Sequence, residues 1–156
     1  MFFYGITDVG KRRSANQDNF IVMRYSEDVL LAVVCDGMGG HDHGEVASQS
    51  IYKSLSSFLL QHAVASEGLE DKMLSDALAY AYEELDKLAI AGDTRQMGTT
   101  LTLLYFHSNG CTAAHIGDSR IYHLRPSSHT ILYKSRDHSL VYDLYQAGEL
   151  TYEEMK

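Results

Sequence analysis

The sequence is poor in the features that would place it in several large protein classes. Its 156 residues include one proline and two cysteines, which excludes a proline-rich linker and a disulfide-built scaffold. No apolar run approaches the roughly 20 residues of a membrane-spanning helix, and no signal peptide is visible. Lysine and arginine number 13 against 21 acidic residues, a net charge of −8, which argues against nucleic acid as a partner. We therefore expect one cytoplasmic domain over residues 1–156, with neither a membrane nor a nucleic-acid partner.

The residues that are present are those of an ordinary folded domain. Hydrophobic residues make up 45% of the chain and charged residues 22%, and a chain of this length can bury a core. Cys35 and Cys111 each lie in an apolar run, which favours two free thiols in a reducing compartment. The acidic excess is compatible with a cation site, because a metal ion relieves the repulsion between crowded carboxylates.

The hydrophobic pattern changes its period twice along the chain. Strand-like stretches come first, at residues 2–9, 19–25 and 29–35, and the short turn between the last two predicts an antiparallel pair. Apolar residues then recur every three or four positions through 47–59 and 74–88, which predicts two amphipathic helices. Further strands are expected at 99–106, 111–116, 120–124 and 130–133, and a short helix at 139–146. This order indicates an α+β fold in which a helix pair covers a sheet.

One aspartate stands at the end of the strongest predicted strand. Residues 30–35 are apolar, and Asp36 follows them directly, before the run Gly37-Met38-Gly39-Gly40. A carboxylate at the mouth of an apolar strand is costly unless something binds there, and glycines let the backbone approach a ligand. Other aspartates flank strands, at positions 8, 18, 118 and 137. Turn chemistry is the simpler explanation for any single one of these, whereas Asp36 is predicted to bind a ligand.

The donor types narrow the choice of ligand. Oxygen-rich sites suit hard cations such as Mg²⁺ or Mn²⁺ better than zinc. His41 and His43 raise the zinc alternative, but this pair lacks two further ligands at a recognisable spacing. The glycine run could instead cradle a phosphate, although it lacks the Gly-Lys-Ser/Thr ending of a P-loop.

Five polar motifs follow one another along nearly the whole chain. They are Arg13-Ser14-Ala15-Asn16-Gln17-Asp18; Asp36-Gly37-Met38-Gly39-Gly40-His41 with Gly44-Glu45 and Ala47-Ser48; Gly98-Thr99-Thr100; Ile116-Gly117-Asp118-Ser119-Arg120; and Asp137-His138-Ser139-Leu140. Together they resemble the metal-dependent protein phosphatases of type 2C, the PPM family, in their bacterial form. The resemblance implies a central β-sandwich flanked by helix pairs, in α-β-β-α layers, with a two-metal cleft at one end.

The resemblance also implies an activity and a role for each site residue. The activity would be hydrolysis of phosphoserine and phosphothreonine in proteins by a water activated between two Mn²⁺ or Mg²⁺ ions. Asp36 would bridge both ions, Gly37 would offer its carbonyl to one of them, and Asp18 would hold water of the metal shell. Arg13 would grip the substrate phosphate with two parallel hydrogen bonds, and Asp118 would help form a third, weaker metal site.

The sequence departs from the family pattern in two residues and at its end. Met38 stands where some eukaryotic relatives have a histidine proposed as general acid, so protonation of the leaving group would fall to metal-bound water. Gln17 stands where many relatives have glutamate, which removes one negative charge beside the metals. The later Ser-Asp-Gly and Asp-Asn motifs, whose aspartates complete the metal shells, are absent. We therefore expect a sandwich incomplete at its C-terminal end, weak metal binding, and self-association through exposed sheet. The alternative function is a non-catalytic module that binds phosphoprotein or a partner chain.

Overall fold

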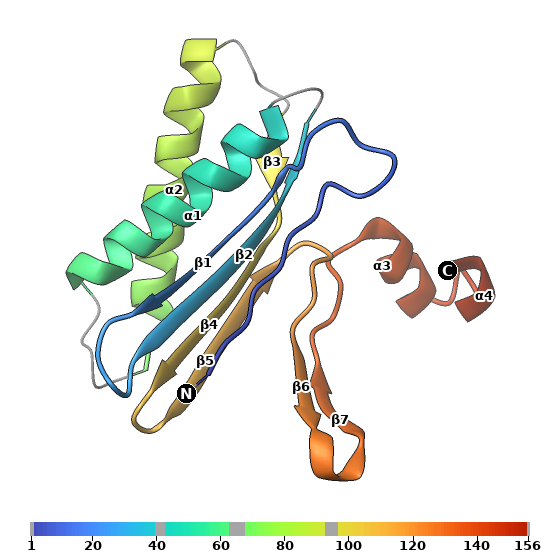
Figure 1. The fold of residues 1–156 in the computed structure, drawn as a ribbon. Helices are drawn as coiled ribbons and strands as arrows, with labels where there is room; N and C mark the ends of the chain where they lie inside the picture. Colours follow the sequence, from blue (N-terminus) through green and yellow to red (C-terminus); the bar gives the residue numbers. More distant parts are fainter. Residues whose placement is uncertain (1, 40–42, 63–67, 93–96, 156) are drawn as a thin grey trace.

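An antiparallel sheet and a pair of long helices form the centre of the protein (Figure 1). The computed structural model describes residues 2–39, 43–62, 68–92 and 97–155. The sheet has five strands in the order β1-β2-β4-β5, with β3 paired to the end of β2. Its strands are β1 (Asp18–Arg24), β2 (Leu30–Met38), β3 (Gly98–Thr99), β4 (Leu101–His107) and β5 (Gly110–Ile116). The helices are α1 (His43–His62) and α2 (Asp71–Gly92).

The rest of the chain forms a second, smaller sheet and two short helices. Strands β6 (Tyr122–Arg125) and β7 (Thr130–Lys134) pair as a hairpin around the short 3₁₀ turn Pro126–Ser128. Two helices follow, α3 (Leu140–Gln146) and α4 (Tyr152–Met155). Ser139 caps α3 by accepting a hydrogen bond from the backbone of Tyr142. The predicted α+β class is confirmed, and so are the antiparallel β1–β2 pair and both long helices.

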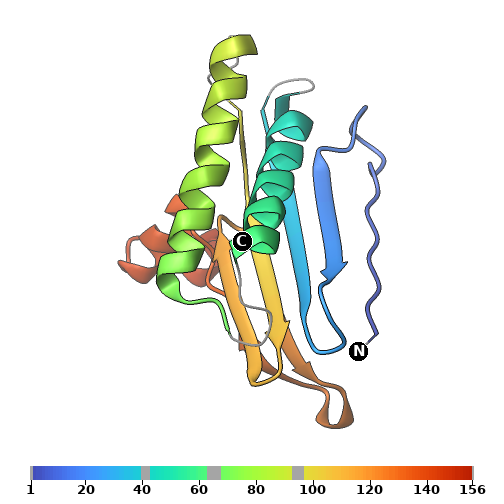
Figure 2. The same cartoon turned by 90° about the vertical axis from the view of Figure 1, so that its left-hand side faces the viewer.

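The core lies between the helix pair and one face of the sheet. Figure 2 shows α1 and α2 on the same side of the strands. Along β2, Leu31, Val33 and Cys35 are buried, whereas Val34 and Asp36 point to the other face. A one-residue slip of this strand would exchange the two sets, so burial of the apolar set fixes the register. The same register places Asp36 on the open face of the sheet, away from the helices.

The strand expected at residues 2–9 is wrong. This segment forms no ladder with the described residues and crosses the open face of the sheet as irregular chain. It packs closely there, since a Cβ atom on Gly5 would lie 2.5 Å from the ring of Phe20. Its aromatic and branched residues suggested a strand, but such residues also suit packing on an apolar surface, and composition does not report a hydrogen-bonded neighbour.

Both cysteines are free thiols, as predicted. Cys35 is buried and Cys111 is exposed. Burial raises the pKa of Cys35 to about 12, so this thiol stays protonated and unreactive at neutral pH. Among the helices that the structure describes, none combines the length and the apolar character needed to cross a membrane.

Candidate metal and phosphate site

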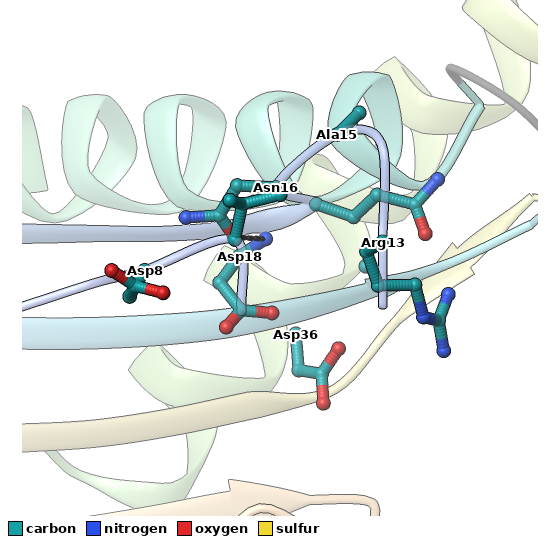
Figure 3. A pocket seen from close by; sticks show the side chains of 9 residues that line it. Asp8, Arg13, Ala15, Asn16, Asp18 and Asp36 are labelled. Carbon is teal, nitrogen blue, oxygen red and sulfur yellow. Dashed lines mark hydrogen bonds between the residues drawn. The ribbon is translucent and has the colours of Figure 1, made fainter. Parts of the chain in front are cut away.

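Two carboxylates face each other across β1 and β2. The strand register pairs Asp18 directly with Asp36, and such partners have Cβ atoms about 4.5–5.5 Å apart. Figure 3 shows both side chains beside the loop that carries Arg13. Like charges opposite each other in a sheet are destabilising, so this pair favours the binding of a cation between the two carboxylates.

Two adjoining hollows surround Asp36 and Gly37. The first has a volume of about 200 Å³ and is lined by Asp8, Val9, Arg13, Ala15, Asn16, Gln17, Asp18, Asp36 and Gly37. The second has a volume of about 350 Å³ and is lined by Arg13, Gln17, Asp36, Gly37, Met38, Gly39, Thr100 and Asp118. The structure therefore brings together all five site residues predicted from the sequence, which are Arg13, Asp18, Asp36, Gly37 and Asp118.

The charge around Asp36 is mostly negative. Partial burial raises the pKa of Asp36 above its ordinary value, and the nearby carboxylates of Asp18 and Asp118 raise it further. The guanidinium of Arg13 acts in the opposite direction but does not reverse the shift. An ionised Asp36 is therefore costly in the protein alone, and a bound cation would remove that cost.

The available donors are those of a partly hydrated hard cation. The carboxylates of Asp18, Asp36 and Asp118 and the carbonyl of Gly37 are all oxygen ligands, which Mg²⁺ and Mn²⁺ prefer. Within the described residues, no three Asp, Glu, His or Cys side chains lie close enough together to hold an ion unaided. Magnesium commonly binds through one or two carboxylates and keeps several waters, so the facing pair fits it. The zinc alternative rests on His41, which, like Gly40, lies outside the described residues.

A chain of hydroxyl groups holds Asp36 next to Asp118. The Asp36 N–H donates to Oγ1 of Thr100 over 3.0 Å, and the Thr100 N–H donates to the Asp36 carbonyl over 2.9 Å. Oγ1 of Thr100 lies 2.6 Å from Oγ of Ser119, the residue after Asp118. Thr100 and Ser119 thus position two acidic residues from distant parts of the chain. Thr100 and Ser119 both lie in motifs recognised in the sequence, but nothing in the sequence indicated that their hydroxyl groups are in contact.

Replacing Thr100 by valine tests this contact. We expect Thr100→Val to lower the free energy of unfolding by about 1–3 kcal/mol, because the Asp36 N–H loses its hydroxyl acceptor. Urea denaturation measures the change. Thr102→Val is the matched control, since Thr102 is also buried but its hydroxyl makes only a 3.4 Å hydrogen bond to the Val34 carbonyl. Equal losses in the two variants would contradict the positioning role of Thr100.

The loop that carries Arg13 is tied to both β2 and α1 through Gln17. The Gln17 carbonyl accepts from the Ser48 hydroxyl over 2.7 Å and from the Gly37 N–H over 3.2 Å. The Gln17 side-chain amide donates to the Gly39 carbonyl over 3.3 Å. Gln17 was interpreted from the sequence only as a lost negative charge. The structure gives it a further role, because it joins the loop, the strand end and the start of the helix.

Glycine is required where α1 meets the end of β2. A Cβ atom on Gly37 would lie 2.0 Å from the carbonyl oxygen of Gly44. Conversely, a Cβ atom on Gly44 would lie 2.9 Å from the carbonyl carbon of Gly37. The two backbones therefore touch without room for a side chain, and this approach sets the first turn of α1 beside the site.

Two of the other strand-flanking aspartates serve local structure. Asp8 accepts a hydrogen bond from the Gly10 N–H over 2.7 Å, as expected for turn chemistry. Asp137 accepts from both ends of the Arg120 guanidinium, and the Nε–Oδ1 distance is 2.7 Å. This bidentate pair lowers the pKa of Asp137. Asp137 lines neither of the two hollows around Asp36.

Comparisons with known proteins agree with the geometry. The sequence model of the Protein phosphatase 2C family matches residues 10–143. Protein phosphatase PhpP of Streptococcus pneumoniae is 35% identical over 151 residues, which cover 96% of this chain and 60% of PhpP. The serine/threonine phosphatase of S. agalactiae has a similar structure, with a TM-score of 0.77, 33% identity, and coverage of 96% of this chain and 61% of that one.

A third comparison concerns a structure that contains metal. The catalytic domain of the serine/threonine protein phosphatase PstP, solved in complex with two manganese ions, gives a TM-score of 0.73 at 32% identity. The similarity covers 93% of this chain and 59% of that one. The chain spans about 60% of the length of the curated relatives it matches.

Proposed function

This chain belongs to the protein phosphatase 2C family, and we propose that it removes phosphate from phosphoserine and phosphothreonine in protein substrates. The observation that carries the proposal is the facing pair Asp18 and Asp36, which shares one hollow with Arg13. Residues 1–156 act as a single phosphatase-like domain in this proposal. The alternative of a non-catalytic module is not favoured, because the similar proteins are named as phosphatases.

Four residues would hold the cations in the proposed reaction. Asp36 would be the ligand shared by two Mn²⁺ or Mg²⁺ ions, Gly37 would offer its carbonyl, and Asp18 would bind through water. Asp118 would contribute to a third site. When bound, the cations supply Lewis acidity, which makes water nucleophilic near neutral pH and offsets the charge of the phosphoryl group.

Arg13 orients the phosphate. Among the described residues it forms no ion pair within the chain, so its guanidinium is available to a ligand. A guanidinium donates two parallel hydrogen bonds to phosphoryl oxygens, which fixes the direction of attack as well as the charge. Water oxygen bonds to phosphorus, the bond from phosphorus to the serine or threonine oxygen breaks, and that oxygen takes a proton from water. Met38 lines the hollow and has no proton to donate.

Hydrolysis of a phosphothreonine peptide tests this proposal. We expect release of inorganic phosphate that requires Mn²⁺ and stops with a chelator. Arg13→Ala should lower kcat/KM by about 10- to 100-fold, because a charge-assisted hydrogen bond contributes about 1.5–3 kcal/mol. Arg12→Ala is the control, since Arg12 is exposed and lines neither hollow. Absence of metal-dependent phosphate release from the unmodified chain would contradict the proposal.

We also propose that two copies of this chain associate through the open face of the sheet. Phe20 and Val34 are 37% and 45% exposed there, and they border an apolar hollow of about 640 Å³ under the N-terminal segment. Large exposed apolar patches mark interaction surfaces, and a self-complementary patch gives a twofold dimer. The free thiols favour a reducing compartment, so we propose the cytoplasm as the location.

Light scattering after size-exclusion chromatography measures the mass of the species in solution. We expect a dimer for the unmodified chain and a monomer for Val34→Lys, because a charge in the patch would be buried without a partner. Val46→Lys is the control, since Val46 is similarly exposed, at 42%, but lies on α1. A monomeric unmodified chain, or a Val34→Lys variant that remains dimeric, would contradict this surface.

A further inference from the structure

An apolar hollow lies next to the candidate site, outside the residues that hold cations or phosphate. It has a volume of about 320 Å³ and is bounded by α1, α2 and the β2–β3 pair. The buried side chains of Ile51, Leu85 and Leu101 form its floor. Met38 and Tyr82 also line it, and they are 56% and 48% exposed. The hollow therefore opens to solvent beside these two side chains.

Met38 borders both this hollow and the candidate site. The same side chain lines the hollow that contains Asp36, Gly37 and Asp118. Met38 follows Asp36 by two positions in β2, which is about 6.6 Å along a strand. An extended peptide covers about the same distance in two residues. A side chain near a phosphorylated residue can therefore reach the apolar hollow while the phosphate lies at Asp36 and Arg13.

The lining selects for an apolar side chain. Leu78 and Met97 add to the apolar wall, and a polar group placed against such a wall would lose water without gaining a partner. The carboxylate of Asp86, also in the lining, repels acidic side chains. Methionines adapt to several apolar shapes, so the hollow accepts more than one hydrophobic residue type. Its volume is at the lower end of the range for ligand pockets, about 300–1,000 Å³, which suits one side chain.

We propose that this hollow binds an apolar side chain within two residues of the phosphorylated serine or threonine of the substrate protein, and so sets sequence preference. The position of the phosphate rests on the proposed phosphatase function. Binding of the apolar side chain does not require hydrolysis, so the two proposals can fail separately.

Methyl NMR of the chain with ¹³C-labelled methionines tests the proposal in the presence of Mg²⁺. The probes are two phosphothreonine peptides that differ only in having leucine or serine two positions before and after the phosphothreonine. We expect the leucine peptide to shift the methyl signals of Met38 and Met97 and to bind about tenfold more tightly than the serine peptide. The signals of Met23 and Met73 serve as internal references, because these residues line neither hollow.

A substitution at the mouth of the hollow completes the test. Tyr82→Glu should weaken binding of the leucine peptide by about tenfold and remove the preference for it. Tyr80→Glu is the control, because Tyr80 lies on the same helix and is 39% exposed but does not line the hollow. Equal affinity for the two peptides, or a preference that survives Tyr82→Glu, would overturn the proposal.

Phosphate release from the same peptides with Mn²⁺ separates the two proposals. Shifts at Met38 and Met97 without any phosphate release would support peptide binding in the apolar hollow and contradict the phosphatase function. Equal phosphate release from both peptides without a shift at Met97 would contradict binding of an apolar side chain in the hollow and support the phosphatase function.

Discussion

Asp36→Asn is expected to abolish metal-dependent hydrolysis, with a loss of at least about 1,000-fold in kcat. Removing one group that stabilises charge in a hydrolytic site typically costs about 10²–10³-fold, and in the proposed reaction Asp36 would be a ligand to both cations. Asparagine keeps the shape of the side chain but removes the charge that faces Asp18. Phosphate release from a phosphothreonine peptide with Mn²⁺ measures the loss. A variant that keeps more than a tenth of the activity would rule out Asp36 as the bridging ligand.

The same substitution should change stability in a direction that depends on metal. The folded-state pKa of Asp36 is raised by burial and by neighbouring carboxylates. For such a group the folded protein binds more protons than the unfolded chain, so stability falls as pH rises from the ordinary aspartate pKa through the folded value. Without metal, Asp36→Asn should therefore melt higher than the unmodified chain at pH 7, and the difference should shrink towards pH 4.

Adding Mg²⁺ should reverse the order of the two melting temperatures. A ligand that binds only the folded state stabilises it, and the variant has lost the central donor. Asp28→Asn is the control, because Asp28 is exposed in the turn at the opposite end of the β1–β2 pair. If Asp36→Asn gains as much from Mg²⁺ as the unmodified chain does, the cation binds elsewhere.

Gly37→Ala is expected to cost at least about 3 kcal/mol of folding free energy, at or above the usual range for overpacking of about 1–3 kcal/mol. The added methyl group would lie 2.0 Å from the Gly44 carbonyl oxygen and 2.7 Å from the Gln17 carbonyl oxygen. Both are backbone atoms, so relief requires moving α1 or the loop as a whole. The midpoint of urea denaturation measures the cost, and metal affinity should fall with it because the Gly37 carbonyl moves.

Gly98→Ala is the matched control for this prediction. Gly98 pairs with Met38 in the neighbouring strand, and among the described residues a Cβ atom there would meet only the Met38 side chain, at 3.6 Å. That is ordinary contact, so we expect a change within about 0.5–1 kcal/mol. Similar denaturation midpoints for the two variants would show that the start of α1 can shift at little cost in free energy. The close backbone contact between Gly37 and Gly44 would then not be required for stability.

The sequence predicted the fold class, and it named candidate site residues that the structure brings together, because both leave local traces. Period changes along the chain gave the strands and the helix pair. The apolar run that ends in Asp36 marked the strongest candidate, and the motifs added Asp18 and Arg13. The short turn predicted the antiparallel pair, and the structure added the register that places Asp18 opposite Asp36.

What the sequence could not predict are contacts that join distant residues. The Ser48 hydroxyl meets the Gln17 carbonyl across 31 positions, and the Asp36 N–H meets Thr100 across 64. The local sequence around these residues does not indicate a hydrogen-bond partner so distant in the chain. The expected strand at 2–9 failed for the same reason, since propensity describes a residue and not its neighbour in space. From the sequence, Met38 was interpreted only as a residue that replaces a histidine, yet it lines two hollows.

The hydrogen bond between Asp36 and Thr100 also bears on the order of folding. It closes a loop of 64 residues that contains both long helices. Closing such a loop costs chain entropy that local contacts do not repay, so structures that depend on it form late. The β1–β2 hairpin can pair early and bring Asp18 to Asp36, but Asp118 arrives only after β3 and β4 have docked. Cation binding at the proposed site should therefore report the last stage of assembly. Cleavage after Glu70, between α1 and α2, by a glutamate-specific protease should slow its recovery during refolding.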